Sequence, residues 1–155
     1  MKKISKLAIS ILVCQGAGII GSIFTVASIP TWYAGLTKPS FNPSSWIFGP
    51  VWAILYLLMG VALWLVWKSD SAQKIKAIWL FTAQLTLNAL WSIIFFGLRS
   101  PFLAFVEIIV LWLAILGTII VFSKISRLAM FFLLPYILWV SFAVILNYSI
   151  WQLNY

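Results

Sequence analysis

Polar and aromatic side chains occur together at a few positions inside the long apolar runs of this chain. On a helix, Trp52 and Tyr56 share one face at i, i+4, and Asn88 and Trp91 share one at i, i+3. A further stripe near the C-terminus has helical spacing, with Asn147 next to it: Trp139, Phe142, Ala143 and Leu146. Aromatic walls tipped with a few polar groups are typical of a pocket for a flat apolar ligand, but also of an ordinary helix core. Spacing alone leaves both interpretations open.

The depth of these residues in the apolar runs favours the pocket. Glu107 is the only carboxylate within the runs, and an intramembrane carboxylate usually faces the bundle interior or water. The alternative is a buried carboxyl that hydrogen-bonds to a neighbouring helix. Five positions share the middle-to-outer half of their runs: Trp52, Asn88, Trp91, Glu107 and Asn147. We predict that the proline-containing loop 31–45 is a lid on that side.

The residues that are missing exclude several kinds of chemistry. The chain has no histidine and a single cysteine, Cys14. It therefore lacks the pair needed for an intrachain disulfide, the ligands of a Cys-based metal site and the usual axial histidine of haem iron. Acid–base catalysis has no histidine to use, and no Walker or zincin motif is present. We expect no metal site and no required cofactor.

Composition places the chain in a membrane. Of 155 residues, 65% are apolar and 8% are charged, whereas a soluble domain of this size needs a charged surface. Roughly 20 apolar residues cross the hydrocarbon core as a helix. Five such runs are present, at about 7–29, 46–67, 77–98, 102–123 and 128–151. We predict a single all-α integral membrane domain over residues 1–155, folded as a five-transmembrane-helix bundle.

Prolines and serines mark the expected helix ends. The sequence "NPSS" before Trp46 offers serine N-caps, with Pro50 expected in the first turn of that helix. Ser100 and Pro101 open the fourth helix in the same way. Pro135 lies inside the fifth run, where it frees a backbone carbonyl and is expected to kink the helix.

The segment "GAGIIG", Gly16 to Gly21, has the G-x-G-x-x-G spacing of a dinucleotide-binding loop. That motif requires a preceding strand, and here it lies in the middle of an apolar helix. We predict instead close helix packing through the small residues Ala17 and Gly21.

The basic residues set the expected orientation. One side of the membrane receives Lys2, Lys3, Lys6, Lys68, Lys74, Lys76, Lys124 and Arg127, and the other only Lys38 and Arg99. This predicts a cytoplasmic N-terminus. We expect a prokaryotic plasma membrane and an uncleaved first helix, with the mitochondrial outer membrane as the alternative. Because the basic residues do not cluster on one face, nucleic-acid binding is not expected.

Several segments closely resemble the translocator protein family (TspO), whose bacterial members are called tryptophan-rich sensory proteins and whose mitochondrial members are called the peripheral-type benzodiazepine receptor. The first are "WYAGLTKPSFNP" from Trp32, Trp46, "GPVWAILY" from Gly49 and the pair Met59-Gly60. The likeness continues through "LNALWSIIFFGLR" from Leu87 and "PYILWVSFAVILNYSIW" from Pro135. It covers essentially the whole chain in order.

The resemblance implies a five-helix bundle, often a homodimer, that binds tetrapyrroles, synthetic isoquinoline and benzodiazepine ligands and, in animals, cholesterol. The family's pocket positions correspond here to Ser22, Thr25, Phe48, Gly49, Val51, Trp52, Trp91, Leu98, Trp139, Ala143 and Leu146. In bacterial relatives, the tryptophans that match Trp52 and Trp139 are linked to light-dependent porphyrin breakdown.

Two positions depart from the family pattern. The cholesterol motif ends the fifth helix with a tyrosine followed by a basic residue, but Gln152 stands at that point and no Lys or Arg follows Tyr148. We therefore do not expect cholesterol as a physiological ligand. Glu107 stands where animal relatives carry Asp, so the carboxylate is kept and its reach is longer.

Three functions remain open. We predict the first, a receptor, sensor or transporter that binds metal-free porphyrin or similar flat apolar molecules. Alternatively, the chain is a weak photo-oxidative porphyrin-degrading protein in which Trp52 or Trp139 supplies electrons, or a structural or regulatory membrane subunit with an incidental pocket. For a porphyrin, we expect Lys38 or Arg99 to receive a propionate at the cavity mouth, near Trp32 in the lid.

Overall fold

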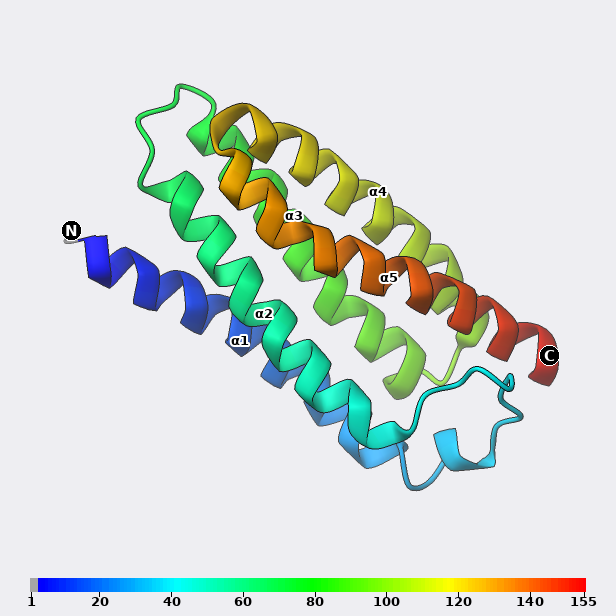
Figure 1. Cartoon of the computed structure of the whole chain (residues 1–155). Helices are drawn as coiled ribbons and strands as arrows, with labels where there is room; N and C mark the ends of the chain where they lie inside the picture. The colour runs from blue at the N-terminus through cyan, green and yellow to red at the C-terminus, as the bar shows by residue number, and fades with distance from the viewer. Residues whose placement is uncertain (1–2) are drawn as a thin grey trace.

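Five long helices make up the protein, in a computed structural model that describes residues 3–155 (Figure 1). They are α1 (Lys3–Ser28), α2 (Ser45–Trp67), α3 (Lys74–Ser92), α4 (Pro101–Ile125) and α5 (Arg127–Asn154). A 3-10 turn, η1 (Tyr33–Gly35), lies between α1 and α2, and a π-helical segment, η2 (Ile93–Gly97), continues α3. Five helical segments are long and apolar enough to cross a membrane. The predicted all-α five-helix membrane fold is confirmed.

The helices extend beyond the apolar runs from which they were predicted. α1 begins at Lys3 instead of residue 7, α3 begins at Lys74 instead of 77, and α5 ends at Asn154 instead of 151. At α1 and α3 the difference arises because the prediction marked only the charge-free residues, whereas α5 continues through the uncharged residues 152–154. Lysines at a helix end remain helical, because their long side chains reach water or headgroups while the backbone keeps its hydrogen bonds.

Serine side chains cap the starts of α4 and α5. The hydroxyls of Ser100 and Ser126 each accept a hydrogen bond from the backbone N–H three residues on, at 3.4 and 3.2 Å. Pro101 lies at the first helical turn beside Ser100, as predicted. Ser44 precedes α2 but makes no side-chain cap bond.

Two prolines lie within helices. Pro50 is in the second turn of α2, and not in the first as predicted, because the helix begins at Ser45. It cannot donate to the carbonyl of Trp46, so one helical hydrogen bond is lost there. Pro135 lies inside α5 and likewise cannot donate to the carbonyl of Phe131. Each of these two helices therefore has one interrupted hydrogen bond in its backbone ladder.

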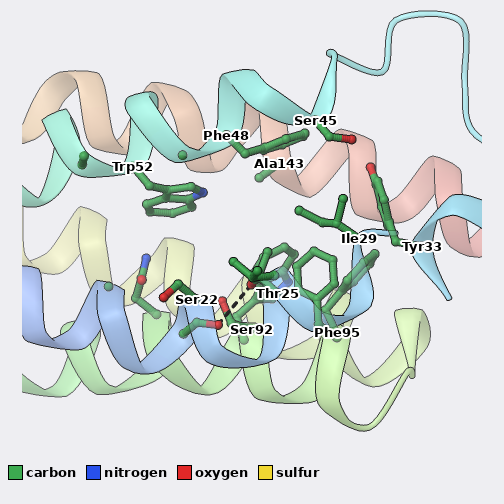
Figure 2. A pocket seen from close by; sticks show the side chains of 18 of the residues that line it. Ser22, Thr25, Ile29, Tyr33, Ser45, Phe48, Trp52, Ser92, Phe95 and Ala143 are labelled. Carbon is green, nitrogen blue, oxygen red and sulfur yellow. Dashed lines mark hydrogen bonds between the residues drawn. The ribbon is translucent and has the colours of Figure 1, made fainter. Parts of the chain in front are cut away.

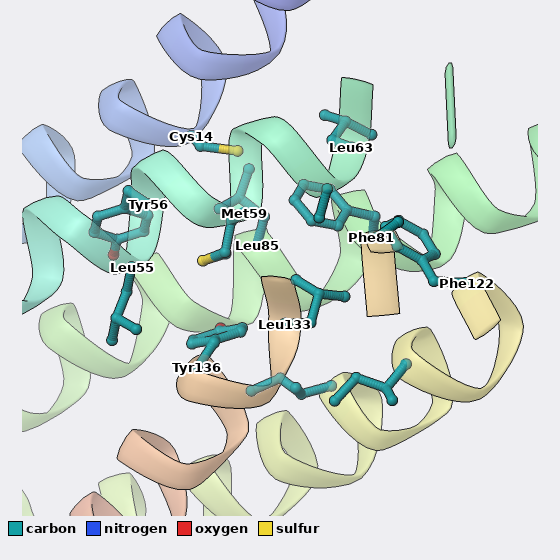
Figure 3. Close-up of a cluster of buried hydrophobic side chains, with 14 of the residues drawn as sticks. Cys14, Leu55, Tyr56, Met59, Leu63, Phe81, Leu85, Phe122, Leu133 and Tyr136 are labelled. Atoms are coloured by element: carbon teal, nitrogen blue, oxygen red, sulfur yellow. The ribbon is translucent and has the colours of Figure 1, made fainter. Parts of the chain in front are cut away.

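An apolar core fills the middle of the bundle (Figure 3). Phe81 of α3 stacks on Phe122 of α4 with their ring centroids 5.8 Å apart. Met59 of α2 and Leu133 of α5 are almost completely buried nearby in the same cluster. Side chains from all five helices thus contribute to one core, with Cys14 as the buried contribution of α1.

A chain of buried hydrogen bonds crosses this core. The Tyr56 hydroxyl donates to Asn88 Oδ1, and Asn88 Nδ2 donates to the Tyr136 hydroxyl at 3.0 Å. That hydroxyl in turn donates to Gln84 Oε1 at 2.9 Å. The chain ties α2, α3 and α5 together, and it satisfies polar groups that could find no water in hydrocarbon.

α1 packs on its neighbours through glycines. A Cβ at Gly60 would lie 2.8 Å from the backbone Cα of Ile11, and one at Gly18 would lie 2.5 Å from the Tyr56 ring. A Cβ at Gly21 would lie 3.1 Å from the Ser92 hydroxyl of α3. The predicted close packing at Gly21 is present, Ala17 packs half-buried against the main core, and Gly18 is a further position of tight approach.

Gly60→Ala is expected to lower the free energy of unfolding by about 1–3 kcal/mol, because the added methyl meets backbone that cannot move aside cheaply. Gly16→Ala is the matched control, since it makes the same change on α1 with no atom within 4 Å of the new Cβ. Unfolding in mixed detergent micelles measures both. Equal stability of the two variants would contradict the close crossing of α1 and α2.

Candidate functional site

A cavity of about 440 Å³ lies among four of the five long helices (Figure 2). Its walls come from the C-terminal half of α1, the N-terminal half of α2, the end of α3 with η2, and the C-terminal half of α5, with Tyr33 of η1 at one end. Among residues 3–155, none from α4 lines it. A volume of several hundred Å³ is usual for a small-molecule site.

Most residues predicted from spacing and from the family resemblance line this cavity. They are Ser22, Thr25, Phe48, Gly49, Trp52, Tyr56, Asn88, Trp91, Trp139, Ala143, Leu146 and Asn147. Figure 2 shows Trp52 and Phe48 of α2 facing Ser22 and Thr25 of α1 across the open space. The structure thus brings together predicted residues from four separate helices.

Three predicted residues lie outside the cavity. Val51 packs half-buried against the main core, because each residue of a helix points about 100° away from the next. Leu98 follows η2, whose wider turn shifts the helix face, and its side chain is 64% exposed. Phe142 packs between Trp139 and Phe41, with ring centroids 5.5 and 6.3 Å away.

The α1–α2 loop is tied down at the end of the bundle where α5 finishes (Figure 1). The backbone N–H of Thr37 donates to Asn154 Oδ1, and Asn154 Nδ2 donates to the Thr37 carbonyl, both at 2.8 Å. Trp32 does not line the cavity itself. Its ring packs edge-on against Phe95, a residue of the cavity wall, with centroids 5.5 Å apart.

Tyr33 is the loop residue that reaches the cavity. It is buried, and burial raises its pKa to about 12, against the opposing effect of its hydrogen bond to Asn42. Lys38 Nζ lies 4.8 Å from the Tyr33 ring centroid and donates to the carbonyls of Ala34 and Leu36. Arg99 is exposed and has a left-handed backbone, with φ of 54°. Neither predicted cation therefore lines the cavity.

Asparagines and stacked rings fix the orientation of the tryptophans. Trp91 Nε1 donates to Asn147 Oδ1 at 3.0 Å, and Asn147 Nδ2 donates to the carbonyl of Pro101 at 2.8 Å. The Trp91 ring also stacks on Phe95, with centroids 5.1 Å apart. On α2, the Trp52 ring stacks on the Tyr56 ring, with centroids 5.5 Å apart. The walls are therefore held in place before any ligand binds.

Glu107 takes neither of the two roles considered for it. It is buried, but it does not line the cavity. Neither carboxyl oxygen has a hydrogen-bond partner among the described residues, so the predicted bond to a neighbouring helix is absent as well. Its position outside the cavity could not be predicted from its depth in the fourth run, because depth along a helix does not specify which way a side chain points.

The sequence analysis missed part of the wall. On α1 the missed residues include Gly18, Ile19 and Val26, and near η2 they include Ser92, Phe95 and Phe96. Phe95 follows Trp91 at i, i+4, so the same spacing argument would have found it. The aliphatic residues of α1 carry no such signal, because an apolar residue facing a cavity looks the same in sequence as one facing lipid.

The cavity is uncharged. No acidic or basic side chain of residues 3–155 lines it, and no group of three metal-ligating side chains occurs in that range. The hydroxyls of Ser22 and Thr25 donate to carbonyls of their own helix, at 2.7 and 3.1 Å. The site can therefore hold an apolar ligand by shape and aromatic stacking, with few polar contacts.

Asn147→Leu is expected to lower the free energy of unfolding by about 1–3 kcal/mol, since it leaves the Trp91 indole N–H and the Pro101 carbonyl without partners. Near-ultraviolet circular dichroism should also lose intensity as Trp91 becomes mobile. Ser149→Ala is the control, because its hydroxyl bonds only to the carbonyl of Ile145 in its own helix. An Asn147 variant as stable as this control would show that the bond does not hold the wall.

Comparison with known proteins identifies the family of this chain. The profile of the TspO/MBR family matches residues 10–152. The chain is 45% identical to the tryptophan-rich protein TspO of Archaeoglobus fulgidus, over 97% of this chain and 98% of the relative. It is 40% identical to the translocator protein of Homo sapiens, over 88% and 82%. It is 33% identical to the tryptophan-rich sensory protein of Cereibacter sphaeroides, over 80% and 77%. With its family profile, its fold and its near-complete coverage in agreement, this multi-pass membrane protein belongs to the TspO/MBR family.

Proposed function

We propose that the protein binds a metal-free porphyrin, or a similar flat apolar molecule, in this cavity and acts as a receptor, sensor or transporter for it. The observation that carries the proposal is the placement of Trp52, Trp91 and Trp139, from three helices, around one uncharged cavity. Indole rings stack well on a flat conjugated ligand. Relatives named as a translocator and as a sensory protein fit the same two roles.

The metal-free form is proposed because, among the described residues, the cavity lining has no histidine, cysteine or methionine to bind haem iron, and the hydroxyls of its two tyrosines, Tyr33 and Tyr56, are hydrogen-bonded to asparagines. The sequence has no histidine. Cys14 and Met59, two sulfur-containing side chains of the apolar core, are fully buried and do not line the cavity. The protein then needs no bound cofactor of its own, and the porphyrin is its ligand.

A porphyrin also carries two propionates, which need a cation or water. Lys38 is the better candidate, because its ammonium lies over Tyr33, which lines the cavity. Lys38→Gln is therefore expected to weaken porphyrin binding about threefold and to reduce its dependence on salt. Arg99→Gln is the control with the same change of charge. Equal affinities of both variants and the parent at low and high salt would exclude a propionate contact at Lys38.

A second candidate function is light-dependent porphyrin breakdown. Trp52 and Trp139, the two tryptophans that this chemistry would use, both line the cavity. Porphyrin would then serve as both the light absorber and the substrate, dissolved dioxygen would be the oxidant, and a neighbouring indole would supply an electron to the excited porphyrin or trap a radical. Loss of porphyrin absorbance in light, but not in darkness, would favour this function over a sensor or transporter.

Assembly and orientation complete the proposal. Most basic residues lie on the side of the membrane that holds the N-terminus. This excess supports a cytoplasmic N-terminus in a prokaryotic plasma membrane. The family resemblance supports a homodimer. No contact with cholesterol or nucleic acid is proposed.

Titration of the purified protein with metal-free protoporphyrin in darkness should quench tryptophan fluorescence saturably. Trp52→Phe and Trp139→Phe are each expected to raise the dissociation constant about fivefold, since each removes about 1 kcal/mol of stacking. Trp79→Phe is the matched control, because Trp79 is 70% exposed on α3 and lies outside the cavity. No saturable quenching would remove this function and favour a structural or regulatory subunit.

A further inference from the structure

The residues that line the cavity differ in exposure according to their helix. Those on α3, η2 and α5, together with Tyr33, are all buried or half-buried. The exposed ones belong only to α1 and α2: Ile19, Ser22, Val26, Ser45, Trp46, Gly49 and Ala53. Exposed lining residues on two adjacent helices indicate an opening between those helices. The cavity therefore opens along the seam between α1 and α2.

The seam has a defined length and a closed inner end. From Ser45 to Ala53 it runs for nine residues of α2, which span eight helical steps or roughly 12 Å. At its inner end, Gln15 Nε2 of α1 donates to the Ala53 carbonyl of α2 at 3.0 Å. Beyond that bond, the close approach of Gly60 to Ile11 leaves no space between the two helices.

The loop closes the cavity at the end of the bundle. Tyr33 is only 4% exposed there. The Ser28 hydroxyl donates to the carbonyl of Phe96 at 3.0 Å, and the paired bonds between Thr37 and Asn154 hold the middle of the loop. An entrance through the loop would require several of these contacts to break, whereas the seam is already open.

The chemistry of the seam suits lipid more than water. Three of its exposed side chains are large and apolar, with Ile19 64%, Val26 67% and Trp46 74% exposed. The hydroxyl of Ser22 donates to a carbonyl of its own helix. Because the seam lies on helices long enough to span the membrane, its exposed edge faces hydrocarbon.

We propose that the ligand enters and leaves the cavity sideways, from the bilayer through the α1–α2 seam, while the loop stays closed. This inference rests on the proposed function, and it narrows the ligand class to molecules that first dissolve in the membrane. Gly49 lies at the middle of the seam and controls its width, because its missing side chain leaves open space on the cavity edge.

Gly49→Leu tests the route in the full-length protein reconstituted in phospholipid nanodiscs. A Cβ at Gly49 has no atom within 4 Å, so the larger side chain fits and projects into the seam. Stopped-flow tryptophan quenching with metal-free protoporphyrin should show association and dissociation rates that both fall about tenfold. A parallel fall of both rates marks an obstructed path, whereas lost contacts would raise the dissociation rate alone.

Gly16→Leu is the matched control, because a Cβ there also has open space but Gly16 does not line the cavity. Ala53→Leu is a second seam variant that keeps the carbonyl accepting from Gln15. Asn154→Ala loosens the loop and should leave both rates within about twofold of the parent.

Saturable binding with parental rates in Gly49→Leu and Ala53→Leu would overturn the route and leave the proposed function standing. So would a large rise of both rates in Asn154→Ala, which would place the entrance in the loop. Absence of saturable quenching in the parent would instead remove the proposed function, and the route with it.

Discussion

Hydrocarbon offers no hydrogen bonds, so polar groups inside this bundle depend on partners within the chain. The bonds of Tyr56, Asn88 and Tyr136 tie α2, α3 and α5 together across the core. The bonds of Asn147 to Trp91 and to the Pro101 carbonyl add the start of α4. These contacts hold four helices in one fixed arrangement, and they hold the aromatic walls of the cavity with it.

α1 joins this arrangement in a different way. Gln15 and Ser28, at the two ends of its cavity-lining segment, donate side-chain hydrogen bonds to carbonyls of α2 and η2. Between them, Ser22 and Thr25 turn their hydroxyls to their own helix. Glycine contacts hold the inner half of α1 tightly, so the outer half can stand apart from α2. The cavity and its open seam both follow from this uneven attachment.

The sequence predicted those features that depend on composition and helical spacing. Charge-free runs located five helices, and the stripe from Trp139 to Leu146 located one wall of the cavity. What it could not predict depends on local geometry. The π-helical segment η2 turns Leu98 outward, and the direction that Glu107 faces is fixed by packing with neighbours that are distant in sequence. Ile19 and Val26 were missed because lipid and an apolar cavity favour the same residues.

The origin of the ligand bears on why the walls carry tryptophan. A molecule transferred from water gains roughly 25 cal/mol for each Å² of apolar surface that is buried. A molecule transferred from lipid gains little from burial, because lipid tails are as apolar as leucine. Affinity for such a ligand must then come from contacts that lipid cannot make, namely stacking on fixed indole rings and a matched shape. Hydrogen bonding that fixes Trp91 and stacking that fixes Trp52 therefore serve binding as well as folding, since a mobile ring would lose entropy on each encounter. In a neutral cavity open to the bilayer, rigid aromatic walls are the main source of selectivity that these residues provide.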